Sequence, residues 1–434
     1  MASLTELKRA IDSLPKGNVY RKVIKGHPYF YHQYSDHGER ISKLISEEEV
    51  APLLARIKER KALLLEYASK AKTKNIKLSD AARRLTGFVM MGDAPVAKFE
   101  EGELLWLDER KAPYAIKRSR SLLPFLSLRV IDISRTNARL LKKAFAIHEE
   151  ESHFLSLYAY AASISDNYWF KPLHSKLKYK DVTFDSDAFS DIALKGDTSF
   201  FPNRAHLTPE LTTGGSFEKG WKKIDGEWWL YKCGTKKEIF SEMLSYELAK
   251  LFLLPSAVYE VDGPYIRSLN FAGENNYEPM ASLFGQDDSY ETIYSGLKEF
   301  PDAIKEEYLS MIFFDAWVNN VDRHNENCGF LRDAETGALI SLAPNFDNNL
   351  ALIARSPLSE DPRDDGFIAS FLRFVKGNED AAARYAKMVF PTIREEDIQE
   401  RVEEVSELTQ YKDEGLSSLL FRRYEYLKKC VSIG

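Results

Sequence analysis

The chain lacks the features that would place it in a membrane or in an oxidising compartment. Its 434 residues include three cysteines, Cys233, Cys328 and Cys430, which are too few and too widely separated to form a disulfide framework or a zinc knuckle. No apolar run approaches the roughly 18–20 residues that a membrane-spanning helix needs. The first residues also lack the basic, apolar and cleavable pattern of a secretory signal peptide. These absences predict a cytoplasmic protein that makes no contact with a membrane.

Positive charge is in the minority overall but is concentrated at the start of the chain. The formal net charge is −6. Residues 1–85 carry 18 Lys and Arg against 10 Asp and Glu, a balance of +8, which leaves −14 for the remainder. A basic segment ahead of an acidic remainder suggests an anionic partner such as nucleic acid. The alternative is a solvated helical surface without such a partner.

Residues 1–85 are predicted to form a β-meander followed by a long helix. Short runs rich in Tyr, Val and Ile occupy 18–45 and are typical of three antiparallel strands. The runs are separated by turn residues at Lys25-Gly26 and Asp36-His37-Gly38. A serine and three glutamates then predict the start of a helix over 47–72. Interleaved aromatic and basic residues on a small sheet are compatible with nucleic-acid binding. The aromatic residues could instead belong to a core, and the helix could equally be a docking or dimerisation arm.

The segment 313–333 carries the most informative polar pattern. It contains Asp322-Arg323-His324 and then Asn327, between a predicted helix over 304–321 and a short apolar strand. A carboxylate followed five residues later by a carboxamide suits phosphoryl transfer, because the Asp can accept a hydroxyl proton and the Asn oxygen can help to hold Mg²⁺. The pattern alone is also compatible with an ordinary capped turn. Asp315, inside the helix, needs a partner and is predicted to brace this loop.

A phosphate-binding apparatus is predicted upstream. The turn Thr212-Thr213-Gly214-Gly215-Ser216 combines hydroxyls with two glycines that let backbone N–H groups approach an anion. A hairpin with an Asp225-Gly226 turn follows and ends at Lys232, where a buried lysine would need an anion. The next helix, over 237–254, carries Glu242 at a position from which it could pair with Lys232.

A second carboxylate, Asp347, follows the hairpin predicted over 329–343. This is where a kinase places its main Mg²⁺ ligand. The ordered set Lys232, Asp322, Asn327 and Asp347 therefore predicts an ATP- and Mg²⁺-dependent phosphotransferase.

These residues make the chain resemble the HipA-like serine/threonine kinase family, whose members are bacterial and often belong to toxin–antitoxin modules. The resemblance spans roughly residues 86–430 and is most specific at Asp322–Asn327 and around Asp347. It implies an α+β, bilobal protein-kinase-like fold. A small β-rich N-terminal lobe would precede a mostly helical C-terminal lobe, and the basic hairpin and long helix would form an extension outside the usual family pattern.

The resemblance also implies roles for individual residues. Asp322 would be the catalytic base, Asn327 and Asp347 would hold Mg²⁺, and Lys232 would contact the ATP phosphates. The family's loop pattern Ser-x-x-Gly-x-x-x-Lys is matched by Gly215 and Lys219, with Thr212 in place of the leading Ser. Some members autophosphorylate a hydroxyl of this loop, for which Thr212, Thr213 and Ser216 are the candidates here. The predicted nucleotide contacts are Thr212, Thr213, Gly214, Gly215, Ser216, Lys219, Lys232 and Glu242.

The predicted organisation has four parts. Residues 1–85 form the docking or nucleic-acid-binding extension, 86–195 an N-terminal subdomain and connector, 196–275 the kinase N-lobe and 276–434 the kinase C-lobe. The leading hypothesis is a protein serine/threonine kinase that acts as a toxin or growth regulator, with an antitoxin as partner. The alternatives are a small-molecule kinase of the aminoglycoside type and a DNA-tethered, nucleotide-binding regulatory protein.

Overall fold

The computed structural model divides into two compact units, Met1–Arg83 and Arg84–Gly434. It describes residues 7, 9–11, 13–16, 18–24, 27–36, 39–71, 85–100, 102–132, 134–145, 147, 152–198, 207–355 and 357–432. None of the helices in these ranges is long and apolar enough to span a membrane. The two units are considered separately below.

The first unit is an antiparallel meander followed by a long helix, as its sequence predicts. Strands β1 (Asn18–Ile24), β2 (His27–Asp36) and β3 (Glu39–Ile45) pair in sequence order. Helix α2 (Glu47–Ala71) begins at a turn in which Ser46 donates from its N–H and its hydroxyl to Glu49. The predicted turn residues Lys25, Gly26, His37 and Gly38 lie outside the described residues, as does Lys72 at the predicted end of the helix.

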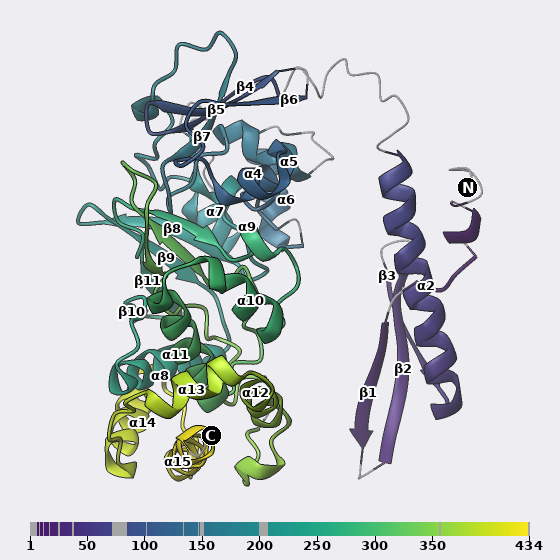
Figure 1. The fold of residues 1–434 in the computed structure, drawn as a ribbon, viewed down its shortest axis with the longest axis vertical. Coiled ribbons are helices and arrows are strands. Elements are labelled where there is room, and N and C mark those ends of the chain that lie inside the picture. Colours follow the sequence, from purple (N-terminus) through teal and green to yellow (C-terminus); the bar gives the residue numbers. More distant parts are fainter. Residues whose placement is uncertain are drawn as a thin grey trace. The chain divides into compact units, whose positions relative to one another are not determined.

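The second unit opens with a four-stranded antiparallel sheet in the order β6-β5-β4-β7 (Figure 1). Its strands are β4 (Gly87–Met91), β5 (Ala94–Glu100), β6 (Glu103–Trp106) and β7 (Tyr168–Pro172). Short helices complete this region: α4 (Tyr114–Ser119), α5 (Leu122–Ser127), α6 (Thr136–Ala144), α7 (Ser190–Lys195), and the 3₁₀ turns η1 (Ser152–Ala159), η2 (Tyr179–Asp181) and η3 (Pro209–Thr212).

A second four-stranded antiparallel sheet, in the order β10-β11-β9-β8, follows. Its strands are β8 (Lys219–Ile224), β9 (Glu227–Lys232), β10 (Tyr259–Asp262) and β11 (Tyr265–Leu269). Between β9 and β10 the chain forms α8 (Lys236–Phe252), which Thr235 and Glu238 cap reciprocally. The predicted hairpin at 225–226 and the predicted helix are both confirmed.

A third sheet, β12-β13-β14, is attached to the region of α4 by a buried ion pair. It consists of β12 (Asn276–Pro279), β13 (Gly329–Arg332) and β14 (Leu339–Leu342). Glu278 of β12 pairs with Arg332 of β13, and both side chains are almost completely buried. The Tyr114 N–H donates to the Glu278 carboxylate at 2.6 Å, and Arg332 donates to the Ala112 carbonyl at 3.0 Å. This ion pair thus anchors the segment before α4 to the third sheet.

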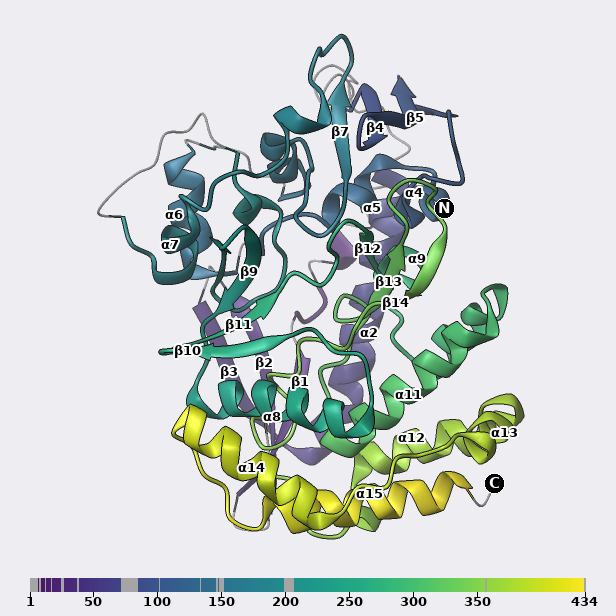
Figure 2. The same cartoon turned by 90° about the vertical axis from the view of Figure 1, so that its left-hand side faces the viewer.

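Helices make up the rest of the unit. Helix α9 (Ala281–Phe284) lies beside α4, whereas the helices between residues 302 and 432 gather at the end away from the β4–β7 sheet (Figures 1 and 2). They surround an aromatic core in which Phe313 and Trp317 of α11 are fully buried. The elements are α9 (Ala281–Phe284), α10 (Tyr290–Gly296), η4 (Leu297–Glu299), α11 (Asp302–Val318), η5 (Pro362–Asp364), α12 (Gly366–Gly377), α13 (Glu379–Lys387), α14 (Glu395–Thr409) and α15 (Leu416–Ser432). The α+β class predicted from the sequence is confirmed.

One local prediction needs correction. The helix over 304–321 ends three residues early, because Asn319 adopts a left-handed conformation with φ of 55° and turns the chain toward Asp322.

Candidate active site

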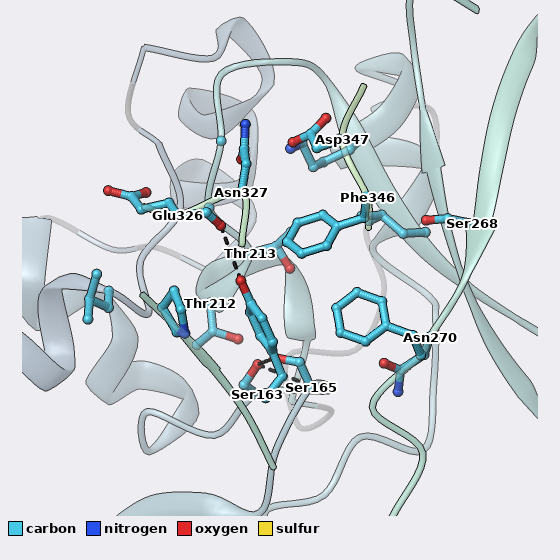
Figure 3. A pocket seen from close by; sticks show the side chains of 18 of the residues that line it. Ser163, Ser165, Thr212, Thr213, Ser268, Asn270, Glu326, Asn327, Phe346 and Asp347 are labelled. Atoms are coloured by element: carbon cyan, nitrogen blue, oxygen red, sulfur yellow. Dashed lines mark hydrogen bonds between the residues drawn. The ribbon is translucent and has the colours of Figure 1, made fainter. Parts of the chain in front are cut away.

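A cavity of about 250 Å³ brings together side chains from distant parts of the second unit (Figure 3). Its walls come from the loop 212–217, strands β9 and β11, the loop 322–327, the turn 346–349 and the turn 163–166. The predicted site residues that line it are Thr212, Thr213, Gly214, Gly215, Ser216, Lys219, Lys232, Asp322, Asn327 and Asp347. Glu242 is the exception, because it lies in α8 behind Lys232.

Lys232 lies between two carboxylates at the end of β9. Its Nζ is 2.8 Å from Oδ1 of Asp347 and 3.4 Å from Oε2 of Glu242. Burial alone would lower the pKa of Lys232, but the two negative charges outweigh it and hold that pKa above its usual value. Lys232 is therefore a buried cation, as a lysine at the end of this apolar hairpin was predicted to be if anions surround it.

Asp347 is held in an unusual backbone conformation. Its φ is 60°, a left-handed value that costs free energy for a residue other than glycine. Its N–H donates to the Tyr259 hydroxyl at 3.0 Å, and the next N–H, of Asn348, donates to Glu242 at 2.8 Å. Burial would raise the pKa of Asp347, but the positive charges of Lys232 and Lys219 hold it well below the usual range. The carboxylate is therefore ionised at neutral pH.

Asp315 and Arg323 form the framework of the loop that carries Asp322. The Arg323 guanidinium donates to both Asp315 oxygens at 2.9 Å. Asn320 donates to the same carboxylate at 3.2 Å. The prediction that Asp315 braces this loop is confirmed.

The same guanidinium also reaches the turn that carries Asp347. It donates to the backbone carbonyls of Asn327 and Phe346, at 2.6 and 2.8 Å, and to the side-chain oxygens of Asn345 and Asn348. Arg323 thus fixes two loops of the cavity relative to each other, which a planar group with five donors can do and a lysine cannot.

Asp322 itself is only partly buried. Its side chain is 31% exposed and lies 3.4 Å from the guanidinium of Arg355, which is largely exposed. Burial raises the pKa of Asp322, and the neighbouring charge of His324 opposes this shift. The Asn327 side-chain N–H donates to the Asp322 carbonyl at 3.2 Å, which leaves the carboxamide oxygen of Asn327 for another partner.

Two of the three loop hydroxyls are already engaged in hydrogen bonds within the protein. Thr212 and Thr213 donate to the Pro209 carbonyl, at 3.0 and 2.8 Å, and the Thr213 oxygen also accepts from the Trp221 indole at 3.0 Å. Ser216 is exposed. Among the three candidates for modification, Ser216 therefore has the accessible hydroxyl.

Lys219 lies beneath the same loop. It is 5% exposed, and burial lowers its pKa to about 7. Gly215 has a φ of +85°, and a Cβ added there would overlap the Lys219 ammonium group. The backbone angle therefore favours glycine at this position, and any side chain there would also have to displace the Lys219 ammonium group.

Aromatic rings form one wall of the cavity. Phe271 and Phe346 have ring centroids 5.2 Å apart, and Tyr277 lies edge-on to both. The Tyr277 hydroxyl donates to the Glu326 carbonyl at 3.2 Å, so this wall is attached to the loop that carries Asp322 (Figure 3). An apolar, aromatic wall of this kind suits a flat ring such as a nucleobase.

Sequence reasoning missed residues that reach the cavity from the region before 196. Ser163 and Ser165 share a hydrogen bond of 2.9 Å at its lower edge in Figure 3, and Arg129 forms a buried ion pair of 2.7 Å with Asp166 beside them. Arg135 binds the backbone of the loop 213–215. No local sequence pattern signals these roles, because the partners of Arg135 lie about eighty residues away.

Neither a protein-family model nor a curated protein sequence matches the chain. Solved structures that are similar to it include the following two. The proinflammatory kinase CtkA of Helicobacter pylori is 16% identical, with a TM-score of 0.40, over 50% of this chain and 93% of CtkA. HipA of a toxin–antitoxin system of Shewanella oneidensis MR-1, solved with HipB and operator DNA, is 12% identical, with a TM-score of 0.49, over 80% of this chain and 97% of HipA. At this level of similarity the chemistry must be inferred from the chain's own residues.

Proposed function

We propose that the chain is an ATP- and Mg²⁺-dependent phosphotransferase of the HipA-like kind, and specifically a protein serine/threonine kinase. The observation that carries the proposal is the convergence of Lys232, Asp322, Asn327 and Asp347 on one cavity with an aromatic wall. Phosphoryl transfer requires a lysine held in place by a glutamate and two oxygen ligands for a metal ion. It also requires a carboxylate that can take the proton of the hydroxyl group that receives the phosphoryl group.

The proposed Mg²⁺ site fits the residues present. Asp347 is held in its ionised form. The side-chain N–H of Asn327 donates to the Asp322 carbonyl, so the side-chain oxygen of Asn327 remains available to a cation. Mg²⁺ commonly binds through one or two protein ligands together with substrate phosphates, and it supplies neutralisation of the phosphate charge. Lys232 would bind the phosphates, and Glu242 would keep its ammonium group in place.

Asp322 is proposed to accept the proton of the attacking hydroxyl. Its carboxylate is partly exposed, so a hydroxyl on a protein segment can reach it from solvent. An acceptor on a separate protein agrees with a role as toxin or growth regulator controlled by an antitoxin. Ser216 is the proposed position of autophosphorylation, because Thr212 and Thr213 are bonded to Pro209. A small-molecule acceptor, as in aminoglycoside-type kinases, is the alternative.

Incubation with Mg²⁺ and ATP followed by mass spectrometry tests the proposal. We expect a phosphate on the peptide that contains Ser216, and none in the Asp347→Asn or Ser216→Ala variants. Phosphate on Ser216 would support protein phosphorylation, whereas turnover of an aminoglycoside without protein phosphate would favour the alternative. A wild-type chain that neither binds nor turns over ATP would refute the assignment as a whole.

We further propose that residues 1–85 bind nucleic acid. The register places Tyr29, Tyr31 and Gln33 on one face of the first sheet, with Leu44 opposite Tyr31. Tyr29 is 38% and Leu44 is 60% exposed, so this face is not covered by the described residues. An exposed aromatic face on a segment with a charge balance of +8 suits a polyanion.

We also propose that the rest of the chain divides into the subdomain and connector 86–195, the kinase N-lobe 196–275 and the kinase C-lobe 276–434.

A mobility shift of the full chain with duplex DNA tests the proposal that residues 1–85 bind nucleic acid. Binding should weaken steeply with added salt, because each phosphate contact releases counterions. Tyr29→Ala and Leu44→Glu, both on this exposed face, should weaken binding, and Lys376→Glu on the exposed side of α12 should not. Equal binding by all three variants would show that the β1–β3 sheet does not form the nucleic-acid-binding surface.

A further inference from the structure

The loop 212–216 is held from behind by Arg135, the residue that precedes α6. The guanidinium Nε donates to the Gly215 carbonyl at 2.7 Å, and Nη2 donates to the carbonyls of Thr213 and Gly214 at 2.5 Å each. Arg135 is 3% exposed. Three successive carbonyls therefore point at one buried cation.

This arrangement determines where the N–H groups of the loop point. In a trans peptide the N–H points opposite to the C=O, and none of the described residues has a cis peptide bond. The carbonyls of 213, 214 and 215 face Arg135, so the N–H groups of Gly214, Gly215 and Ser216 face the other way. All three residues line the cavity, and none of these N–H groups donates a hydrogen bond to another described residue. Successive N–H groups turned into a concavity form an anion site.

We propose that Arg135 is a positioning residue for nucleotide phosphates, which it serves without touching them. Arg135 binds the carbonyls of residues 213–215, and the N–H groups of the same peptides, which belong to residues 214–216, bind the phosphate. This inference rests on the proposed nucleotide-binding function and assigns a part of it to a residue outside the predicted lobes.

The charge of Arg135 reinforces the arrangement. A cation behind the loop attracts the negative ends of the three peptide dipoles, and their positive ends therefore face the cavity. Lys219 adds a fourth donor group close to Gly215. A lysine at 135 could place a charge there, but it could not hold three carbonyls in one plane, because its ammonium group has no rigid fork.

The support of Arg135 is itself fixed. Asn137, two residues later in α6, donates from its side chain to the Ala193 carbonyl at 3.0 Å. Its N–H donates to Glu218 at 3.2 Å, just beyond the loop. Helix α6 is thus bonded to α7 on one side and to the far end of the loop on the other. These bonds fix the backbone from which the Arg135 side chain extends, so the position of its guanidinium is restrained at both ends.

Isothermal titration of the full chain with Mg²⁺-ATP and with adenosine tests the role of Arg135. Adenosine shares the base and ribose but has no phosphate. We expect Arg135→Lys to weaken ATP binding about tenfold or more, in line with the loss of an oriented anion site, and to leave adenosine binding unchanged. Arg139→Ala, an exposed arginine of the same helix, is the matched control and should change neither affinity.

Hydrogen–deuterium exchange of the wild-type chain gives a second readout that needs no variant. ATP should slow exchange of the 214–216 amides, and adenosine should not. The inference is overturned if Arg135→Lys binds ATP as the wild type does, if it loses affinity for adenosine to the same extent, or if ATP leaves those amides unprotected. These outcomes differ from failure of the proposed function, in which the wild-type chain would not bind ATP at all.

Discussion

Arg323 binds Asp315 through two hydrogen bonds of 2.9 Å, one from Nε and one from Nη2. Both side chains are buried, with 7% and 1% exposed. The pair occupies the junction between α11 and the loop that carries Asp322, and the remaining donors of Arg323 reach the turn that carries Asp347. The distance between the two proposed catalytic carboxylates therefore depends on a residue that performs no chemistry itself.

Replacement of Arg323 by lysine should lower both stability and activity. The variant keeps the charge but loses the fork, so that several carbonyl and carboxamide oxygens lose their donor. We expect a loss of about 1–3 kcal/mol in the free energy of unfolding, because the charge opposite Asp315 is kept while buried oxygen acceptors lose their donors. Urea unfolding measures this loss. Arg363→Lys is the control, because Arg363 forms only an exposed ion pair with Asp361 and should change stability little.

The Asp322→Asn variant should separate chemistry from binding. Removal of a general base commonly costs about 10²–10⁴ in rate, and the carboxamide preserves the shape of the side chain. We expect phosphotransfer to fall by that factor while the affinity for ATP stays within about twofold. Glu360→Gln, at an exposed acid further along the chain, should leave both quantities unchanged. Full phosphotransfer by Asp322→Asn would remove it from the role of base.

Gly215→Ala should impair nucleotide binding for two separable reasons. One is the left-handed backbone, and the other is the overlap of a new Cβ with the Lys219 ammonium group. Gly226→Ala is a matched control, because Gly226 also has a positive φ, of +90°, but no atom lies within 4 Å of an added Cβ. The control should lose only the roughly 1–2 kcal/mol that left-handed backbone costs. We expect ATP affinity to fall in the first variant alone, as measured by titration.

Glu210 should make stability depend on pH. Its carboxyl group is fully buried, and burial raises its pKa from 4.5 to about 8. Between these values the folded chain keeps a proton that the unfolded chain releases, so stability should fall as pH rises from about 4.5 to about 8. The Trp221 N–H donates to one Glu210 oxygen at 2.9 Å, and a glutamine oxygen can accept it equally.

Thermal or urea unfolding across this pH range measures the effect. The Glu210→Gln variant cannot ionise and should show a flatter profile, with its greatest gain over the wild type at and above pH 8. Glu227→Gln, an exposed acid at the start of β9, should retain the wild-type slope. An unchanged slope in Glu210→Gln would show that another group is responsible.

The parts of the site that the sequence predicted are those with local signals. The hairpin ending at Lys232 and the helix carrying Glu242 follow from turn residues and apolar periodicity over short stretches, and the pair between them forms at 3.4 Å as the spacing suggested. The catalytic and metal-binding roles themselves stay predictions.

The rest could not be predicted because it depends on distant contacts. Strand β7 pairs with β4, about eighty residues earlier, and its Tyr168, Trp169 and Phe170 are all buried, so it lacks the alternation that marks a half-exposed strand. Arg135 belongs to the region 86–195, in which no catalytic or binding residue was predicted. Its role became apparent only when the carbonyls of 213–215 were brought to its guanidinium.

The buried pair of Glu278 and Arg332 has a consequence for how such a chain can evolve. Its hydrogen bonds extend to the Tyr114 N–H and the Ala112 carbonyl, so a recombination event that exchanged the segment around 110–114 alone would leave two buried charges facing foreign backbone. The segment and the third sheet are therefore expected to be inherited together, and the pair should constrain gene shuffling more strongly than the exposed turn at 225–226.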